Sequence, residues 1–574
     1  MKKLLSVIIW FLLGPALFAG PADPSLLVYT QPDGSKVQYY LHGDEFVSWM
    51  TATDGSVIEI GEDGYVRPAS APSSSQFRAA ALLRASSLPH HTGVQTGDRH
   101  VMVILVQYPD LSFQKIRADF EDLFNGSGAG STGSVKTYFN EQSDGKFRPV
   151  FDIYGPVTLS NNRSTYKTSP NDALNEAAAA LFGNEISDSE LNNYVVHEGF
   201  WAPYYRYYLS DVIMVFAGHS RASGDQDGIW PVSVSASLYE YTGSNGRHYM
   251  IDSYCCSPEL QGASSENMAG IGHVCHEFCH RLGLPDFYDT NSSSHSVVAE
   301  PCLDYSLMES GSYNNSSKTP PPLSMFERSI CGWADLGTDI PAISASGNIT
   351  LHEIGQGSSK TRAFSIPTDK EGELFICEYR SNNAAVNKWS ASLQRGGLLV
   401  YHVDRSDREI SQDGYSQTAA DWWSDKKVNN NGSHPLYYLV PSGDQTNLKN
   451  KDAQKVPFPG SQNVIRYNPV SWNNTSTFVA LSGISYNAAN TSMTLKAHVR
   501  SYPLINNPGN GVYRDGDTFT LKLSPGSEGG ETVSKWYFDT QEVVSPQISL
   551  TSGAHTVEAL LDSGKKLRLE LNVN

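Results

Sequence analysis

The chain has 574 residues and a formal net charge of -18 at neutral pH, from 42 Lys and Arg against 60 Asp and Glu. Domains usually hold about 100–200 residues, so this length predicts several of them. With 39% hydrophobic and 18% charged residues, the composition is typical of globular proteins. The acidic balance argues against nucleic-acid binding and against polybasic attachment to a membrane.

The first twenty residues have the pattern of a secretory signal peptide. Lys2 and Lys3 precede a short apolar run, Leu4–Leu13, and small residues suited to cleavage follow near Ala19. The run is too short to span a bilayer comfortably, and no later stretch is long and apolar enough to do so. We therefore expect an exported protein, extracellular or at the cell surface, without a transmembrane segment.

The next residues, 21–98, are interpreted as a propeptide with its linker. Turn signals at Asp33-Gly34, Asp54-Gly55 and Asp63-Gly64 divide 26–67 into short strands, which predicts a small β meander. These aspartates are interpreted as turn residues. A stretch rich in Ser, Ala and Pro then reaches to about Asp98.

The region 99–336 mixes buried strands with helices without a strict alternation, which predicts an α/β or α+β domain. Its expected strands include 101–106, 210–217 and 249–254, and a helix is predicted over Met268–Leu282. Short strands separated by Gly, Asn and Ser predict an all-β region over 337–500 and a small immunoglobulin-like sandwich over 501–574.

The predicted helix carries the pattern His276-Glu277-x-x-His280. Two histidines four residues apart lie on one helix face, where they can bind one Zn²⁺, and a glutamate after the first can accept a proton from water beside the metal. On another face an apolar stripe packs on a core: Ile271, Cys275, Phe278 and Leu282. We expect the histidine face to look into a cleft.

A third ligand is predicted just beyond the helix. Gly283 permits the left-handed backbone that ends a helix in a sharp turn, and Pro285 discourages its continuation. Asp286 is thereby returned towards the metal, and carboxylate oxygen is a usual zinc ligand that leaves the fourth position for water.

Other donors lie near this pattern. His273 shares the histidine face, and Cys279 lies between that face and the apolar stripe, as a ligand or as a buried or disulfide-bonded residue. A more distant glutamate, Glu300 or Glu309, is an alternative third ligand. The spacing of Gly283 and Asp286 disfavours it.

Residues 276–289, HEFCHRLGLPDFYD, resemble the signature of immune inhibitor A-type metallopeptidases, a metzincin-like family. Weaker similarities at 101–110, 133–147 and 398–404 extend the resemblance over about residues 100–475. It implies one catalytic zinc held by His276, His280 and Asp286, with Glu277 as the general base.

The resemblance also implies that Met308 is the methionine of a Met-turn, an apolar floor beneath the metal. The sequence departs from the usual pattern of the family at two positions. Family members usually have Gly or Ala where Cys279 stands, and Ser310 occupies the place of the tyrosine that some metzincins have two residues after the methionine. Tyr288 and Tyr313 are alternative stabilisers of the transition state.

The seven cysteines all follow residue 254, so a propeptide cysteine cannot block the metal. Asp44 or Glu45 is the candidate group for a carboxylate-based block. The odd count leaves at least one thiol outside any intrachain disulfide. Calcium is a further candidate ligand, at Asp225 and Asp227, although no EF-hand pattern occurs there.

The sequence thus predicts a secreted zinc endopeptidase that acts on proteins or peptides and is inhibited by its own propeptide. The alternative function is a catalytically degenerate surface-binding protein, or adhesin, that uses its β domains.

Overall fold

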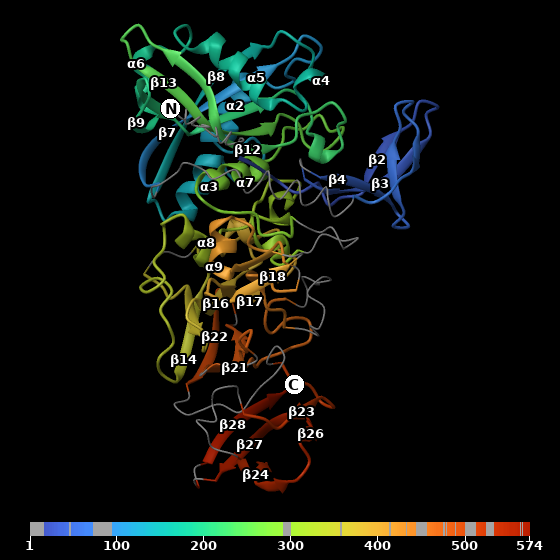
Figure 1. Cartoon of the computed structure of the whole chain (residues 1–574), viewed down its shortest axis with the longest axis vertical. Helices are drawn as coiled ribbons and strands as arrows, with labels where there is room; N and C mark the ends of the chain where they lie inside the picture. Colours follow the sequence, from blue (N-terminus) through green and yellow to red (C-terminus); the bar gives the residue numbers. More distant parts are fainter. Residues whose placement is uncertain are drawn as a thin grey trace, which may run out of the picture. The chain divides into compact units, whose positions relative to one another are not determined.

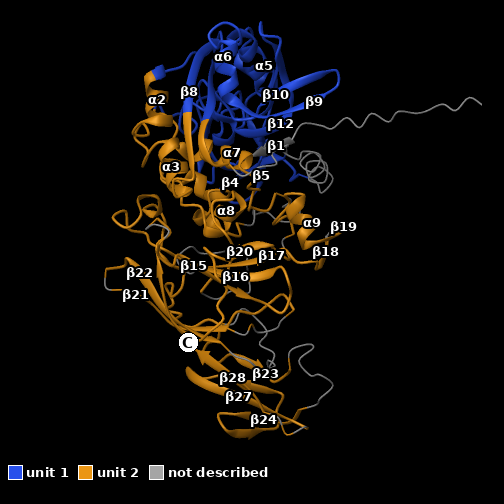
Figure 2. Ribbon diagram, turned by 90° about the vertical axis from the view of Figure 1, so that its left-hand side faces the viewer, with its two compact units in different colours: residues 1–92, 100–117, 151–266 blue, residues 93–99, 118–150, 267–574 orange. Residues whose placement is uncertain are grey.

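The computed structural model describes residues 16–44, 47–72, 95–290, 300–355, 359–412, 415–431, 433–442, 456–473, 477, 479–487, 489–499, 512–523, 533–562, 564 and 566–574. Its elements are labelled along the chain in Figure 1. The chain divides into two compact units (Figure 2). Unit 1 comprises Met1–Thr92, His100–Arg117 and Phe151–Glu266, and unit 2 comprises Gly93–Arg99, Ala118–Val150 and Asn267–Asn574.

The first sheet of unit 1 is a five-stranded antiparallel meander, as expected over 26–67. Its strands are β2 (Leu27–Thr30), β3 (Lys36–Gly43), β4 (Ser48–Ala52), β5 (Val57–Ile60) and β6 (Val66–Pro68). The Oδ1 atoms of Asp33 and Asp54 each accept the backbone N–H two residues later at 2.9 Å, and Asp63 does the same at 3.2 Å. These aspartates are turn residues, as predicted.

The second sheet has eight strands, and its central order is β1-β12-β13-β11-β7-β8, with β10 pairing β13 and β9. The strands are β1 (Ala16–Ala19), β7 (Gly97–Gln107), β8 (Phe147–Thr158), β9 (Val195–Trp201), β10 (Tyr204–Leu209), β11 (Val212–Phe216), β12 (Val232–Thr242) and β13 (His248–Pro258). Strand β11 runs parallel to both β7 and β13, and all five of its residues are buried. A run of apolar residues without polar alternation is therefore explained by burial on both faces.

Short helices accompany this sheet in unit 1: α4 (Arg163–Tyr166), α5 (Pro170–Leu181), α6 (Asp188–Leu191), η1 (Asn192–Tyr194) and η2 (Arg221–Ser223). Apolar side chains of α5 join those of β7, β11 and β13 in one hydrophobic core. Strand β1 falls within the predicted signal peptide, and residues 1–15 lie outside the described residues, so the signal peptide stays a prediction.

Unit 2 holds the helix with the histidine pattern. Its helices are α2 (Arg117–Asn125), α3 (Val135–Gln142), α7 (Ile271–Arg281), η3 (Leu303–Tyr305), η4 (Ser310–Tyr313), α8 (Met325–Ile330), η5 (Lys388–Ser390) and α9 (Ala419–Ser424). The first residue of α2, Arg117, still belongs to unit 1. Helix α7 begins three residues later than predicted, because Gly270 has the extended backbone of an N-cap and the carbonyl of Ser317 accepts the N–H of Gly272 at 2.7 Å.

The rest of unit 2 is rich in strands. One sheet contains β14 (Gly347–His352), β22 (Ser492–Val499) and β21 (Val479–Tyr486), and another contains β15 (Ala363–Pro367), β16 (Glu373–Arg380), β17 (Gly397–Asp404) and β20 (Tyr437–Leu439). Strands β18 (Glu409–Gln412) and β19 (Tyr415–Thr418) form a hairpin.

The C-terminal segment forms two small sheets around one hydrophobic core. Their strands are β23 (Thr518–Thr520), β24 (Val533–Phe538), β25 (Gln541–Val543), β26 (Gln547–Ser549), β27 (Gly553–Leu561) and β28 (Lys566–Val573). The mixed α/β architecture with a strand-rich C-terminal region is as predicted. The propeptide role, the domain boundaries and the immunoglobulin-like assignment stay predictions. Among the described residues, no helix is long and apolar enough to cross a membrane.

Candidate metal centre

Helix α7 presents its two histidines one turn apart, and its apolar stripe packs inside unit 2, to which the helix belongs. The Phe278 ring meets Phe139 of α3 edge-on, with 5.3 Å between ring centroids. Cys275 and Leu282 of the same stripe are buried. This packing fixes the rotation of the helix and hence the direction in which His276 and His280 project.

The turn after α7 follows the predicted glycine mechanism. Gly283 has φ 103°, a left-handed conformation that costs a residue with a Cβ substantially more than glycine. The carbonyl of Cys279 accepts the N–H of Leu284 at 3.1 Å, which closes the helix end. The chain is thereby free to double back towards the histidines.

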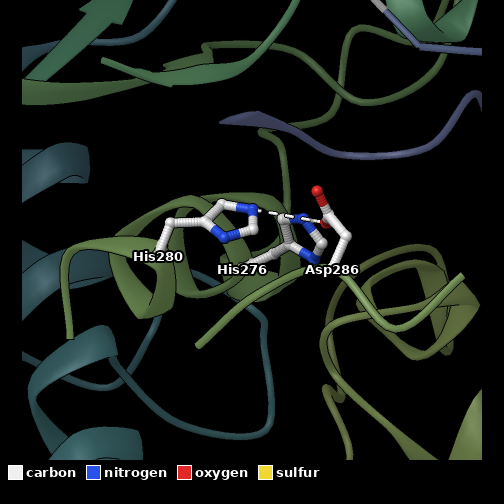
Figure 3. A group of neighbouring side chains, drawn as sticks. All are labelled: His276, His280 and Asp286. Carbon is white, nitrogen blue, oxygen red and sulfur yellow. Dashed lines mark ion pairs between the residues drawn. The ribbon is translucent and has the colours of Figure 1, made fainter. Parts of the chain in front are cut away.

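Asp286 meets both histidines. Its Oδ1 lies 3.3 Å from the Nε2 atom of His276 and 3.3 Å from that of His280. The three ligand atoms lie within 4.8 Å of one another, and all three side chains are buried. Figure 3 shows the two imidazoles directed towards the same carboxylate. We call these three residues the His-His-Asp cluster.

Backbone carbonyls orient both imidazoles. The Nδ1 atom of His276 lies 2.8 Å from the carbonyl oxygen of Leu307, and that of His280 lies 2.8 Å from the carbonyl oxygen of Leu284. A carbonyl only accepts, so each Nδ1 carries a proton and donates it. The neutral tautomer then leaves a lone pair on each Nε2, the atom that faces Asp286.

The loop around Met308 supports the cluster. Met308 is fully buried, and its carbonyl accepts the N–H of Phe287 at 3.0 Å. Since Leu307 holds His276 and Met308 holds the residue after Asp286, this loop fixes two parts of the cluster at once. The role of Met308 as the methionine of a Met-turn stays a prediction.

Charge and burial compete within the cluster. Burial alone would raise the pKa of Asp286, but the proximity of His280 and His276 lowers it to about 2. Burial would lower the pKa of His276, and Asp286 and Glu277 outweigh it, so that the pKa is raised. For His280, burial prevails and the pKa is lowered. Asp286 is therefore anionic at neutral pH beside one neutral and one more basic imidazole.

The donor set fits a zinc ion. In a tetrahedral site with bonds of about 2.0–2.1 Å, neighbouring ligand atoms are separated by roughly 3.3 Å. Both observed separations from Asp286 Oδ1 are 3.3 Å. His276 Nε2 and Asp286 Oδ1 are also buried without a hydrogen-bond partner among the described residues, which is costly unless a cation satisfies them.

The other candidate donors lie outside this cluster. The Nε2 atom of His273 lies 2.9 Å from the hydroxyl of Ser317, and its ring meets Tyr313 edge-on with 4.7 Å between centroids. Glu309 accepts the N–H of Cys302 at 2.6 Å. Neither of these, nor Glu300, belongs to a group of potential metal ligands among the described residues.

Glu277 and Tyr288 are both buried in the same unit. Their predicted roles, and that of Tyr313, stay predictions. His276 and His280 are each only 1% exposed, and the expected cleft beside them stays a prediction.

The remaining predicted residues take local roles. Asp44 is buried, and its Oδ1 accepts the N–H of Val47 at 3.1 Å, while Glu45 lies outside the described residues. Asp225 pairs with Arg163 at 2.7 Å and Asp227 with Lys167 at 3.0 Å. Because cationic side chains already neutralise these aspartates, the structure gives the calcium expectation no support.

All seven cysteines are described, and none forms a disulfide. Cys279 is fully buried and does not belong to the His-His-Asp cluster. It lies, with Cys275, close enough to Tyr138 of α3 to raise the pKa of that phenol, although burial is the larger cause. The interpretation of Cys279 as a buried residue is favoured over that of a ligand.

The His-His-Asp cluster is typical of zinc hydrolases. Two histidines on one helix and an aspartate beyond a glycine turn form a donor set suited to the zinc of such an enzyme. Residues 212–329 match the family model of immune inhibitor A peptidase M6, catalytic domain. The matched segment includes α7, Asp286 and Met308. This match supports a metallopeptidase and confirms the resemblance to the family over residues 212–329. A search of curated proteins gave no match.

Proposed function

We propose that this protein is a secreted zinc endopeptidase in which His276, His280 and Asp286 hold the metal. The observation that carries the proposal is the convergence of three buried ligand atoms, with 3.3 Å from each histidine nitrogen to one carboxylate oxygen. The family match over 212–329 supports the same chemistry. It falls on the catalytic segment, so the adhesin alternative gains nothing from it.

Zinc, when bound, would supply a Lewis acid that polarises a peptide carbonyl and acidifies water. Glu277 follows a ligand directly on α7, where its carboxylate accepts the proton of the attacking water. The same carboxyl group then gives this proton to the nitrogen of the leaving amine. The Nδ1 bonds to Leu307 and Leu284 keep the imidazoles in the metal-binding tautomer.

Latency is the second part of the proposal. The three ligand side chains are at most 8% exposed in the chain that still carries residues 21–98, which is little for a site that must admit a polypeptide. We propose that cleavage within 21–98 releases an active form after export. The carboxylate block by Asp44 or Glu45 is the candidate mechanism.

One experiment tests the base and the latency together. Casein hydrolysis is measured with the full chain and with the form lacking residues 1–98, each as wild type and as Glu277→Gln. The shortened wild type should be the more active, and Glu277→Gln should lose about 10²–10⁴-fold or more while zinc content is retained. Glu371→Gln, an exposed position, is the control for the charge change.

Undiminished hydrolysis by Glu277→Gln would remove Glu277 as the base. Equal activity of the full and shortened wild types would end the latency proposal. Hydrolysis that a zinc chelator does not affect would end the proposal as a whole.

A further inference from the structure

The segment that carries Asp286 is held from a distant part of the chain. The side-chain amide of Asn429, which follows α9, donates from Nδ2 to the carbonyl oxygen of Phe287 at 2.7 Å across 142 residues. The N–H of Phe287 donates to Met308. Hydrogen bonds therefore hold both the N–H and the carbonyl group of Phe287, the residue after Asp286.

Asn429 is a saturated hydrogen-bonding centre. Nδ2 also donates to the carbonyl of Tyr437 at 2.6 Å, and Oδ1 accepts the N–H groups of Leu436 at 2.8 Å and Tyr437 at 3.0 Å. These four bonds use the two donors and two acceptor sites of the amide. Asn429 is only 1% exposed, so its geometry is fixed by protein groups rather than by solvent.

The next residue holds the other end of the same segment. Oδ1 of Asn430 accepts the N–H of Thr290 at 3.2 Å and its hydroxyl at 2.6 Å. At the first end of the segment, the ring of Phe287 also packs on Tyr437, with 4.4 Å between ring centroids. Two consecutive asparagines thus hold residues 287–290, immediately after the ligand.

Lys426 brings a positively charged group close enough to interact with Asp286. Burial lowers its pKa to about 8, repulsion from Arg281 acts in the same direction, and attraction to Asp286 opposes both. The ammonium of Lys426 is therefore within electrostatic reach of the ligand carboxylate.

We propose that Asn429 and Asn430 are positioning residues of the metal centre, and that they fix the loop from which Asp286 reaches the ion. This inference rests on the proposed zinc function. The two histidines need no such help, because a packed helix already fixes their separation, whereas Asp286 lies on a loop. Outer-shell groups that orient metal ligands typically contribute about 10–100-fold to the affinity for the metal. Both asparagines lie outside the matched segment 212–329.

The test measures metal binding on the full-length protein. Zinc affinity is determined by competition with a chromophoric chelator for the wild type, Asn429→Ala and Asn430→Ala. We expect a loss of about 10–100-fold for Asn429→Ala and a smaller loss for Asn430→Ala. The visible absorption of the cobalt-substituted protein should also change, because a displaced carboxylate alters the ligand geometry.

Asn387→Ala is the matched control. Asn387 is also a buried asparagine, but it donates to Glu353 at 2.9 Å and accepts from Trp389 at 3.1 Å. This variant should keep the wild-type cobalt spectrum and zinc affinity, even if its melting temperature falls. Wild-type affinity and spectrum in Asn429→Ala would overturn the inference.

If Asn429→Ala does not fold, Thr290→Val replaces it. This change removes the hydroxyl that donates to Asn430 and keeps the shape of the side chain. Because Asn430→Ala also removes the bond from the Thr290 N–H, Thr290→Val should weaken zinc binding by no more than Asn430→Ala does, and the double variant should lose no more than Asn430→Ala alone. Independent, additive losses would contradict a shared contact. Failure of the zinc function itself would look different, because the wild type and His276→Ala would then bind zinc equally.

Discussion

Unit 2 contains two buried groups of histidines and carboxylates that are built on opposite plans. In the His-His-Asp cluster, two imidazole nitrogens point at one oxygen from 3.3 Å, longer than a usual hydrogen bond. In a second group, centred on carboxylates of β16 and β17, the histidines and an arginine make ordinary hydrogen bonds to the carboxylates. We call this second group the sheet ion network; its members are Glu373, His402, Asp404, Arg408 and His434.

The sheet ion network is internally satisfied. Glu373 accepts from His402 at 2.8 Å and from Arg408 at 2.6 Å through different oxygens. Asp404 accepts from His434 at 2.8 Å and from Arg408 at 3.2 Å. Arg408 therefore bridges the two carboxylates, and each of them has protein hydrogen-bond donors without an added ion.

The two groups differ in whether hydrogen bonds join their members. Where several ligand atoms face one common point and no hydrogen bond joins them, a cation completes the group. Where the carboxylates already accept hydrogen bonds from histidine and arginine side chains, the group stabilises the fold without an ion. Histidine and carboxylate content alone does not separate a metal site from a structural network.

The largest contrast is expected from single histidine deletions. His276→Ala should lower bound zinc from one ion per chain to none, because two ligands hold zinc far more weakly than three. His402→Ala should retain the full zinc content and lose stability instead. Elemental analysis after dialysis measures both. Loss of zinc from His402→Ala would break the proposed distinction.

A smaller effect is expected for the network carboxylate. Glu373→Gln removes the charge that pairs with Arg408 and His402, and breaking a buried ion pair in this way typically costs about 3–5 kcal/mol. Urea unfolding should show this loss, with unchanged zinc affinity. Glu371→Gln, two residues earlier and exposed, should leave the free energy of unfolding nearly unchanged. A stable Glu373→Gln variant would show that the network contributes little.

The smallest effect concerns a histidine that belongs to neither group. Burial, and then repulsion from His276, lowers the pKa of His273 to about 4. Its contribution to stability is present above about pH 6.5, where the unfolded state also releases the proton, and is lost as the pH falls from there through 4. In chelator, the free energy of unfolding of the wild type should therefore fall more steeply over this range than that of His273→Gln. Parallel curves would contradict the lowered pKa.

Local chemistry made much of the site predictable. The spacing of His276 and His280 and the left-handed turn at Gly283 are each determined within a few residues, and Asp286 follows from them. The position of Met308 came from family resemblance. The histidine spacing and the glycine turn agree with the structure because helix geometry and glycine conformation depend little on the rest of the chain.

The remainder depends on contacts that sequence patterns do not encode. Nothing around Asn429 signals a partner 142 residues earlier, since an asparagine in a polar loop usually marks a turn. The depth at which the histidines are buried could not be predicted either, because periodicity tells which residues share a face but not what lies against it. Helix α7 begins late because of Ser317, another contact distant in sequence.

The buried thiols described above have a practical consequence. Two of them, Cys255 and Cys256, belong to unit 1, and the other five belong to unit 2: Cys275, Cys279, Cys302, Cys331 and Cys377. A thiol-reactive label can reach each one only when the surrounding structure opens. The rate at which peptides from the two units gain the label therefore reports, from one sample and without any engineered probe, which unit opens first.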